Sequence, residues 1–315
     1  MRVLHVTNAY PYEDYSSYGI FIKEQIESLG RIGLSNNIVF INARKFGFVQ
    51  YLFKIREVLL MVSSFKPNVI HCHHEFSIIP CLPALLFYRT HLVLSLLGDL
   101  SQRSWINRFF VAIISSLPRV VLYKSTNVPR IDNAHYLPNG VDMDLFKPFS
   151  RNEAIINLGL DLDKKYVLFV SASLNNPIKR YDLFTRVVNE LKKYDSQVEE
   201  LVMSGVERDL VPSYYMASSF MLLTSDHEGS PNAVKEAMCC NTPIVSTDVG
   251  NVSSLFVNSK GLFVESKGDF AALVKSSKLA LAIPESNGRE VIRRLNLGME
   301  EVSRQLGAIY IKITD

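Results

Sequence analysis

Short apolar runs, separated by longer segments of helical character, recur along the whole chain. The apolar runs lie at residues 2–7, 37–42, 68–72, 91–97 and 119–124, and again at 166–172, 199–204, 220–223 and 261–264. Helical segments are expected at about 20–31, 44–66, 181–193, 233–240, 269–282 and 289–311. Because such runs are typical of strands buried on both faces of a parallel sheet, the pattern predicts an α/β protein with doubly wound sheets.

The length of the chain and one break in this pattern indicate two domains. A chain of 315 residues exceeds the usual size of a single hydrophobic core. The turn signal Pro138-Asn139-Gly140 interrupts the alternation of strands and helices. We therefore place the domain boundary near residues 148–151.

Composition and charge narrow the class of protein. Hydrophobic residues make up 48% and charged residues 21% of the chain, as in a folded globular protein. The four cysteines form no secreted-type disulfide framework, which favours a reducing cytoplasm. Residues 1–150 carry 15 Lys and Arg against 10 Asp and Glu, a balance of +5 that suits anionic lipid or phosphate better than nucleic acid. We expect neither a signal peptide nor a transmembrane helix.

The stretch 225–250 carries the most specific pattern, a turn, a helix, a second turn and a strand. Ser230 is a good helix N-cap, and Pro231 suits the first helical position. Glu228 precedes the helix, and Glu236 lies eight residues later, in its second turn. The amides of residues 229–232 would lie at the positive end of the helix, where a phosphate or a sugar oxygen is favoured.

The segment EGSPN at 228–232, followed by KEAM at 235–238, resembles the glutamate-x7-glutamate signature of retaining nucleotide-sugar glycosyltransferases of family four. The segment LPNGVDMDLFKP at 137–148 resembles the interdomain segment of the same family. The resemblance implies the GT-B fold, in which two Rossmann-like doubly wound domains face each other across a cleft. It implies an acceptor-binding domain at 1–149, a nucleotide-sugar-binding domain at 150–288, and a C-terminal helix, 289–315, that crosses back to the first domain.

The resemblance also assigns site residues in the second domain. Catalytic roles fall to Glu228, which would hold the sugar, and to Lys179, which would contact the donor diphosphate. Ser173 stands where relatives have an arginine for the diphosphate, and the neighbouring Arg180 is the residue that could replace it. The complete donor-binding set comprises Ser173, Lys179, Arg180, Glu228, Gly229, Ser230, Pro231, Asn232 and Glu236, with Glu236 assigned to the ribose hydroxyls.

Two residues of the first domain are expected at the acceptor. Gly19 precedes the first helix and would let a ligand approach the backbone closely. His73 belongs to a His-x-His pattern that relatives carry near the cleft. Relatives also place a histidine just before Gly98, where this chain has Leu97, and this departure weakens the case for full activity.

The histidine- and cysteine-rich stretch 71–75 could suggest a metal site. Strand alternation, however, sends His71 and His73 to one side and Cys72 and His74 to the other, which opposes convergence on one ion. The chain also lacks an Asp-x-Asp motif. We therefore expect no metal and no cofactor, because the nucleotide sugar is itself a substrate.

The basic, aromatic stretch 44–66 has two interpretations. It is either a membrane-surface helix or a helix packed on the sheet of the first domain. The first interpretation would place the protein at the inner face of the membrane, with an anionic lipid surface as a further partner.

Together these observations predict a retaining glycosyltransferase of hexosyltransferase type. It would move sugar from a nucleotide-diphosphate donor to a glycan or lipid-linked acceptor in cell-surface polysaccharide or glycoconjugate synthesis. A nucleotide-sugar 2-epimerase and a non-catalytic, glycosyltransferase-like partner subunit are the alternatives. The sequence names neither the sugar nor the acceptor.

Overall fold

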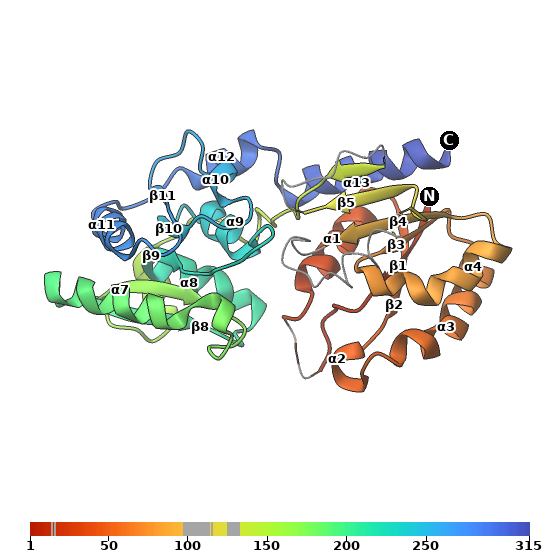
Figure 1. Ribbon diagram of the computed structural model, residues 1–315. Helices are drawn as coiled ribbons and strands as arrows, with labels where there is room; N and C mark the ends of the chain where they lie inside the picture. The colour runs from red at the N-terminus through yellow and green to blue at the C-terminus, as the bar shows by residue number, and fades with distance from the viewer. Residues whose placement is uncertain (14, 16, 97–113, 115, 125–132) are drawn as a thin grey trace. The chain divides into compact units, whose positions relative to one another are not determined.

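The computed structural model of the chain describes residues 1–13, 15, 17–96, 114, 116–124 and 133–315. It divides into two compact units (Figure 1). Unit 1 comprises Met1–Gly140 and Met299–Asp315, and unit 2 comprises Val141–Gly298. The division falls at Gly140, nine residues before the expected 149, so the linker-like segment 141–149 is part of the second unit.

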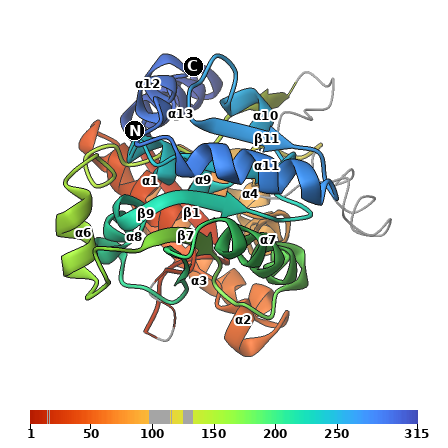
Figure 2. The ribbon, with the colours of Figure 1, turned by 90° about the vertical axis from the view of Figure 1, so that its left-hand side faces the viewer.

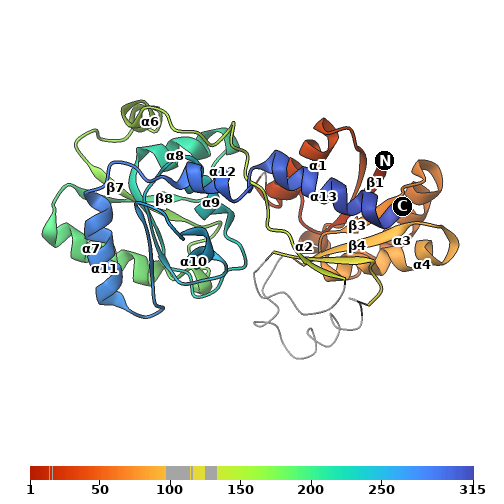
Figure 3. The ribbon, with the colours of Figure 1, turned by 90° about the horizontal axis from the view of Figure 1, so that it is seen from above.

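Unit 1 is built on a parallel sheet with the strand order β2-β1-β3-β4-β5-β6. Its elements are β1 (Arg2–Thr7), α1 (Ile20–Arg31), β2 (Ser35–Phe40), α2 (Ala43–Phe46), α3 (Gln50–Phe65), β3 (Val69–Cys72), the 3-10 helix η1 (Glu75–Cys81), α4 (Leu82–Phe87), β4 (His91–Leu96), β5 (Val120–Tyr123), β6 (Ala134–Tyr136) and α13 (Met299–Thr314). Helices α1 and α13 cover one face, where Leu29 and Leu306 pack on the strands (Figure 3). On the other face, α3, η1 and α4 pack through a second apolar cluster.

Unit 2 has a parallel sheet with the order β11-β10-β9-β7-β8. Its elements are α6 (Arg151–Asn157), β7 (Lys165–Val170), η3 (Pro177–Lys179), α7 (Tyr181–Tyr194), β8 (Val198–Met203), η4 (Arg208–Leu210), α8 (Val211–Ala217), β9 (Ser218–Leu223), α9 (Asn232–Cys239), β10 (Ile244–Thr247), α10 (Val252–Leu255), β11 (Leu262–Glu265), α11 (Phe270–Leu281) and α12 (Gly288–Arg294). Helices α7 and α11 pack on one face, and α8 and α9 on the other (Figure 2). Two doubly wound α/β units are therefore present, as the hydrophobic pattern predicts.

Three sequence expectations need correction. The segment 44–66 is two helices, because Gly47 adopts a φ of 77° between α2 and α3. The segment 289–311 is also two helices, α12 and α13, with Asn296 at a φ of 54° between them. Residues 119–124 do not form the last strand of the first half, since β6 follows at the edge of the sheet.

No helix among the described residues is both long and apolar enough to span a bilayer.

Candidate functional site

The order of the strands in unit 2 reverses at one point, between β7 and β9. From β7 the chain moves outward to β8, returns to the other side of β7 to form β9, and continues to β10 and β11. The two strands that flank this reversal lie side by side (Figure 2). Ligands of doubly wound proteins bind beyond the carboxyl ends of the strands at such a switch point. The loops after β7 and β9 are therefore the place to search for a ligand site.

These two loops bring Lys179 and Glu228 together. Lys179 ends η3 after β7, and Glu228 lies in the loop after β9. The Nζ atom of Lys179 is 2.5 Å from Oε1 of Glu228, and the hydroxyl of Ser225 donates to the same oxygen at 2.9 Å. The side chains of Lys179 and Glu228 are 25% and 15% exposed, so both are accessible from solvent. The site thus places a cation and an oriented carboxylate at the switch point.

Hydrogen bonds to backbone carbonyl oxygens connect the two loops. The hydroxyl of Thr224 donates to the carbonyl oxygens of Lys179 and Arg180 at 2.9 and 3.0 Å. The amide of Asp226 donates to the carbonyl of Ile178 at 2.8 Å. These bonds fix the position of Lys179 relative to Glu228 before any ligand arrives.

Arg180 forms ion pairs with the neighbouring carboxylates of Asp182 and Asp226. Its Nε and Nη2 atoms each lie 2.9 Å from an oxygen of Asp182, and its Nη1 atom lies 3.3 Å from Asp226. The hydrogen bonds to Asp182, with the charges of Asp182 and Asp226, raise the pKa of Arg180. The hydrogen bonds from Arg180 and its positive charge lower the pKa of Asp182. Ser173 is exposed, and its amide and carbonyl both bond the Ser171 hydroxyl.

The backbone of Gly250 lies close against the loop that carries Glu228. Gly250 has a φ of 58°, and a Cβ added there would lie 2.3 Å from the carbonyl oxygen of Gly229. Only glycine fits a position that combines this conformation with this contact. The Val249-Gly250 turn after β10 therefore shapes the loop that carries Glu228 and Gly229.

The start of α9 differs from the expectation. The helix begins at Asn232 with Pro231 as its N-cap, so Pro231 is not at the first helical position and Ser230 is not the cap. The ψ of 115° at Pro231 is extended, and the Ser230 hydroxyl instead lies 3.2 Å from Nζ of Lys235. Lys235 is fully buried. This bond could not be predicted from the sequence, because a lysine in a helix usually faces solvent.

Glu236 has two partners from the segment between β8 and β9. Arg208 donates to its Oε1 at 2.8 Å, and the hydroxyl of Tyr215 donates to its Oε2 at 2.8 Å. The Arg208 guanidinium also lies 4.7 Å from the centre of the Phe146 ring. Arg208 and Tyr215 were not expected at the site, and no motif marks them. Their separations of 28 and 21 residues from Glu236 are fixed only by the fold.

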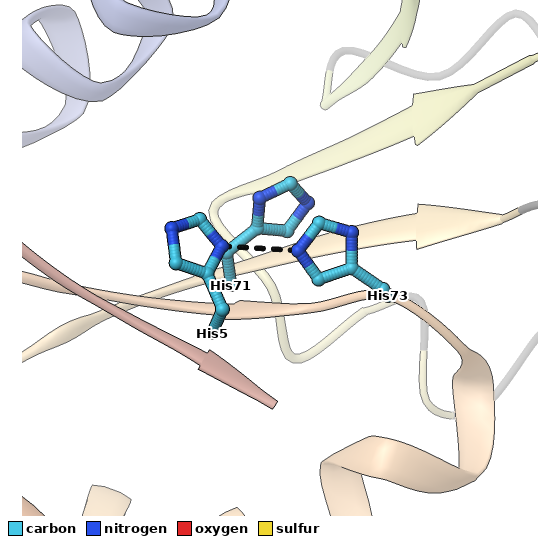
Figure 4. Close-up of side chains that lie close together, drawn as sticks. All are labelled: His5, His71 and His73. Atoms are coloured by element: carbon cyan, nitrogen blue, oxygen red, sulfur yellow. Dashed lines mark hydrogen bonds between the residues drawn. The ribbon is translucent and has the colours of Figure 1, made fainter. Parts of the chain in front are cut away.

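Unit 1 carries a second polar cluster, also at a switch point. Its strand order reverses between β1 and β3, and His5 of β1 lies in register with His71 of β3. His73, just past β3, stacks on His71 with ring centres 4.0 Å apart, and its Nε2 lies 3.0 Å from Nδ1 of His5 (Figure 4). The His5 Nε2 lies 3.1 Å from Oδ1 of Asn36. All three histidines are buried.

The remaining members of this cluster come from three other elements. His71 bonds the Tyr310 hydroxyl of α13 through Nδ1 at 2.6 Å and the Ser95 hydroxyl of β4 through Nε2 at 2.8 Å. Lys124, directly after β5, is buried, and its Nζ has no hydrogen-bond partner among the described residues. Burial lowers the pKa of Lys124 to about 7 and that of His5 to about 4. Burial, together with the charges of its neighbours, also lowers the pKa of His71.

One nitrogen from each of the three histidines lies within 4.8 Å of the others, so the group could hold a metal ion. The alternation argument correctly placed His71 and His73 on one side but left out His5, which comes from another strand. Two features oppose a cation here. Both nitrogens of His71 already have partners, and the charge of Lys124 acts on His71 and His73. The absence of a metal stays a prediction.

Two further expectations concern unit 1. Gly19 has a φ of 68°, and a Cβ there would lie 2.3 Å from the carbonyl carbon of Ala9. The backbone that approaches Gly19 therefore belongs to the chain itself. Leu97 lies outside the described residues.

Comparisons with known proteins identify a family match in unit 2 and two relatives. Residues 184–293 match the family model of glycosyl transferases group 1. The putative teichuronic acid biosynthesis glycosyltransferase TuaC of Bacillus subtilis is 29% identical over 134 residues, 38% of this chain and 34% of its own length. The lipopolysaccharide core biosynthesis mannosyltransferase LpsB of Rhizobium meliloti is 25% identical over 77% of this chain and 79% of its own length.

Similarity to solved structures extends over both units. HepE of Anabaena, in complex with UDP and glucose, superposes with a TM-score of 0.74 at 16% identity, covering 99% of this chain and 100% of that one. At this identity the similarity establishes the fold. The two units therefore have the GT-B fold, and residues 184–293 form a glycosyl transferases group 1 region.

Proposed function

We propose that the protein transfers a sugar from a nucleoside-diphosphate donor to a glycan or lipid-linked acceptor, with retention of the anomeric configuration. The Lys179–Glu228 pair at the switch point of unit 2 carries this proposal. It joins the cation that a diphosphate requires to the carboxylate that can accept hydrogen bonds from sugar hydroxyls.

Lys179 would stabilise the leaving diphosphate. Negative charge accumulates on that group as the glycosidic bond breaks, and a preorganised cation lowers the energy of the transition state. An ammonium group has three donors, so Lys179 can bond Glu228 and phosphate oxygens together. The backbone amides that open α9, beginning at Asn232, would add donors at the positive end of the helix.

Glu228 would orient the sugar, and Glu236 the ribose. The hydroxyl of Ser225 and the ammonium of Lys179 both hold Oε1 of Glu228, which leaves Oε2 to receive a sugar hydroxyl. Arg208 and Tyr215 each bond one oxygen of Glu236. A carboxylate has about four lone-pair directions, so Glu236 retains acceptor capacity for ribose hydroxyls.

The site supplies positive charge from Lys179 rather than from a metal-binding motif, and we expect activity without a divalent ion. Activity should therefore survive an excess of EDTA. Loss of activity in EDTA, with recovery in magnesium or manganese, would show that an ion neutralises the diphosphate.

The relatives support a role in cell-surface polysaccharide synthesis. The names of TuaC and LpsB refer to teichuronic acid and to the lipopolysaccharide core. HepE binds UDP and glucose, which supports a nucleoside-diphosphate hexose as donor. On this basis we place the acceptor among glycans or lipid-linked saccharides. We assign His73, at the switch point of unit 1, to the binding of the acceptor.

An assay with a panel of nucleotide sugars tests the proposal. The wild-type protein should release nucleoside diphosphate from one donor only when an acceptor is present, and NMR of the product should show the anomeric configuration of the donor. Glu228→Gln should lower turnover at least about tenfold, which is about 1.4 kcal/mol of transition-state stabilisation. Release of nucleoside diphosphate without acceptor would favour an epimerase. No binding of any donor would favour a non-catalytic subunit.

A further inference from the structure

Unit 1 exposes large apolar side chains on neighbouring helices. The solvent-facing side of a surface helix normally carries polar or charged side chains. The exposed apolar side chains are Phe46 of α2, Phe48 before α3, Phe53 and Leu60 of α3, and Leu86 and Phe87 of α4. Phe53 is 69% exposed, Leu86 81% and Phe87 76%. We call this set the apolar surface of unit 1.

The helices that carry the apolar surface are neighbours in the fold. Helices α3 and α4 contact each other and lie side by side at the outer edge of unit 1 (Figures 1 and 3). The opposite side of α3 is already used, since Tyr51, Val58 and Val62 are buried in the core of the unit. The other side of α3 exposes Phe53 and Leu60 to solvent, next to the charged side chains of Arg56 and Glu57. Exposed apolar clusters of this kind mark interaction sites.

The segments that carry the apolar surface are rich in basic residues. Residues 43–66 and 82–89 hold Arg44, Lys45, Lys54, Arg56, Lys66 and Arg89. The same segments contain one acidic residue, Glu57, whose carboxylate lies 2.6 Å from Nζ of Lys54. The surface therefore has a charge balance of +5, and its natural partner is both apolar and anionic.

We propose that this surface docks on an anionic lipid bilayer, with Phe53 and Phe87 inserted below the headgroups and the basic side chains in contact with lipid phosphates. Helices with an apolar face and a cationic border bind at such interfaces without crossing the membrane. A second copy of the chain fits less well. In a two-fold symmetric pair the same surface faces itself, which would bring the two sets of six cations together. The bilayer supplies the opposite charge.

This proposal is independent of the transfer reaction, and its test uses no sugar. Wild-type protein is sedimented with vesicles of phosphatidylglycerol and phosphatidylcholine in equal parts, and with vesicles of phosphatidylcholine alone. We expect binding to the anionic vesicles that weakens with salt, because exposed charges are screened beyond about 8 Å at physiological ionic strength. The double variant Phe53→Ser/Phe87→Ser and the double variant Lys45→Glu/Arg56→Glu should each bind about tenfold or more weakly.

A matched control comes from unit 2. Ile156 and Tyr194 are 65% and 66% exposed, so Ile156→Ser/Tyr194→Ser removes comparable apolar side chains from another surface. This control should bind vesicles like the wild type, and the circular dichroism spectra of all variants should agree. Failure of the wild type to sediment at low salt would overturn the proposal, as would equal binding by the phenylalanine variant. Concentration-dependent dimerisation that is abolished by Phe53→Ser/Phe87→Ser would instead assign the surface to a second copy.

Discussion

The guanidinium of Arg208 donates a hydrogen bond to Oε1 of Glu236 at 2.8 Å. The second glutamate of the motif is thus held by a charged partner from outside the motif, and Tyr215 bonds its other oxygen. The two glutamates have different surroundings, since Glu228 faces Lys179 instead. This difference suggests separate tasks, with Glu236 on the nucleoside and the Lys179–Glu228 pair on the diphosphate and the sugar, and each can be tested by itself.

Glu236→Ala should weaken nucleoside binding about tenfold, because a hydrogen bond to a charged group typically contributes about 1.5–3 kcal/mol. It should also lower the free energy of unfolding, since it removes the carboxylate that the partly buried Arg208 faces. Calorimetric titration with the nucleoside and urea denaturation measure the two effects. Glu236→Gln retains the size and one acceptor oxygen and should recover most of the stability. Lost stability with unchanged nucleoside affinity would limit Glu236 to a structural role.

Lys179→Ala should weaken nucleoside diphosphate binding by about ten- to a hundredfold, the loss of a charge-assisted bond to phosphate. The parent nucleoside should bind as before. Lys192→Ala is a suitable control, because Lys192 is also on the second unit and its ammonium donates to the carboxylate of Glu199 on the adjacent strand. Ser173→Arg should strengthen diphosphate binding, since an arginine can bond two phosphate oxygens. Equal losses for nucleoside and diphosphate would show that Lys179 supports the loop without touching phosphate.

Gly250→Ala should disrupt the Glu228 loop, because the new Cβ would lie 2.3 Å from the carbonyl oxygen of Gly229. Gly268→Ala is the matched control. Gly268 also has a positive φ, of 82°, but a Cβ there has no neighbour within 4 Å. The control should cost about 1 kcal/mol from backbone strain alone. Gly250→Ala should cost more and should also lower donor affinity. Equal effects in urea denaturation and donor titration would show that the contact with Gly229 relaxes freely.

Much of the fold could be predicted because the signals are local. Apolar runs mark the buried strands, and the predicted helix at 20–31 is the observed α1, Ile20–Arg31. The predicted helix boundaries were wrong where a single residue with a positive φ interrupts the helix. Gly47 and Asn296 each adopt a positive φ and divide a segment that reads as one amphipathic helix. The strand β6 was missed because only three residues form it, and two of them are exposed.

The candidate site could be predicted only in part. Glu228 and Lys179 were found through motifs, and the structure brings them within 2.5 Å. Arg208 and Tyr215 belong to no motif, and their contacts with Glu236 depend on how the segment before β9 packs on α9. His5 was missed for the same reason. Its proximity to His71 and His73 follows from the pairing of β1 with β3, which no local pattern in residues 2–7 reveals.

Lys124→Met should stabilise unit 1, and the gain should depend on pH. Burial lowers the folded-state pKa of Lys124 to about 7 from the ordinary 10.5. Between these two values the unfolded chain binds more protons than the folded one, so the folded state loses stability as the pH falls, and the penalty is complete below about 7. The gain from Lys124→Met should therefore be about 2 kcal/mol at pH 9 and on the order of 4 kcal/mol at pH 6.

Urea denaturation of the variant and the wild type at both pH values measures this difference. His71 and His73 also titrate at low pH, and Lys124 acts on both, so the comparison must use the difference between the two proteins at each pH. Lys312→Met, on the exposed side of α13, is the control and should change stability little at either pH. The buried ammonium of Lys124, directly after β5, has no hydrogen-bond partner in the part of the chain that the structure describes. A gain that is the same at pH 9 and pH 6 would show that water or a bound group compensates its charge in the folded protein.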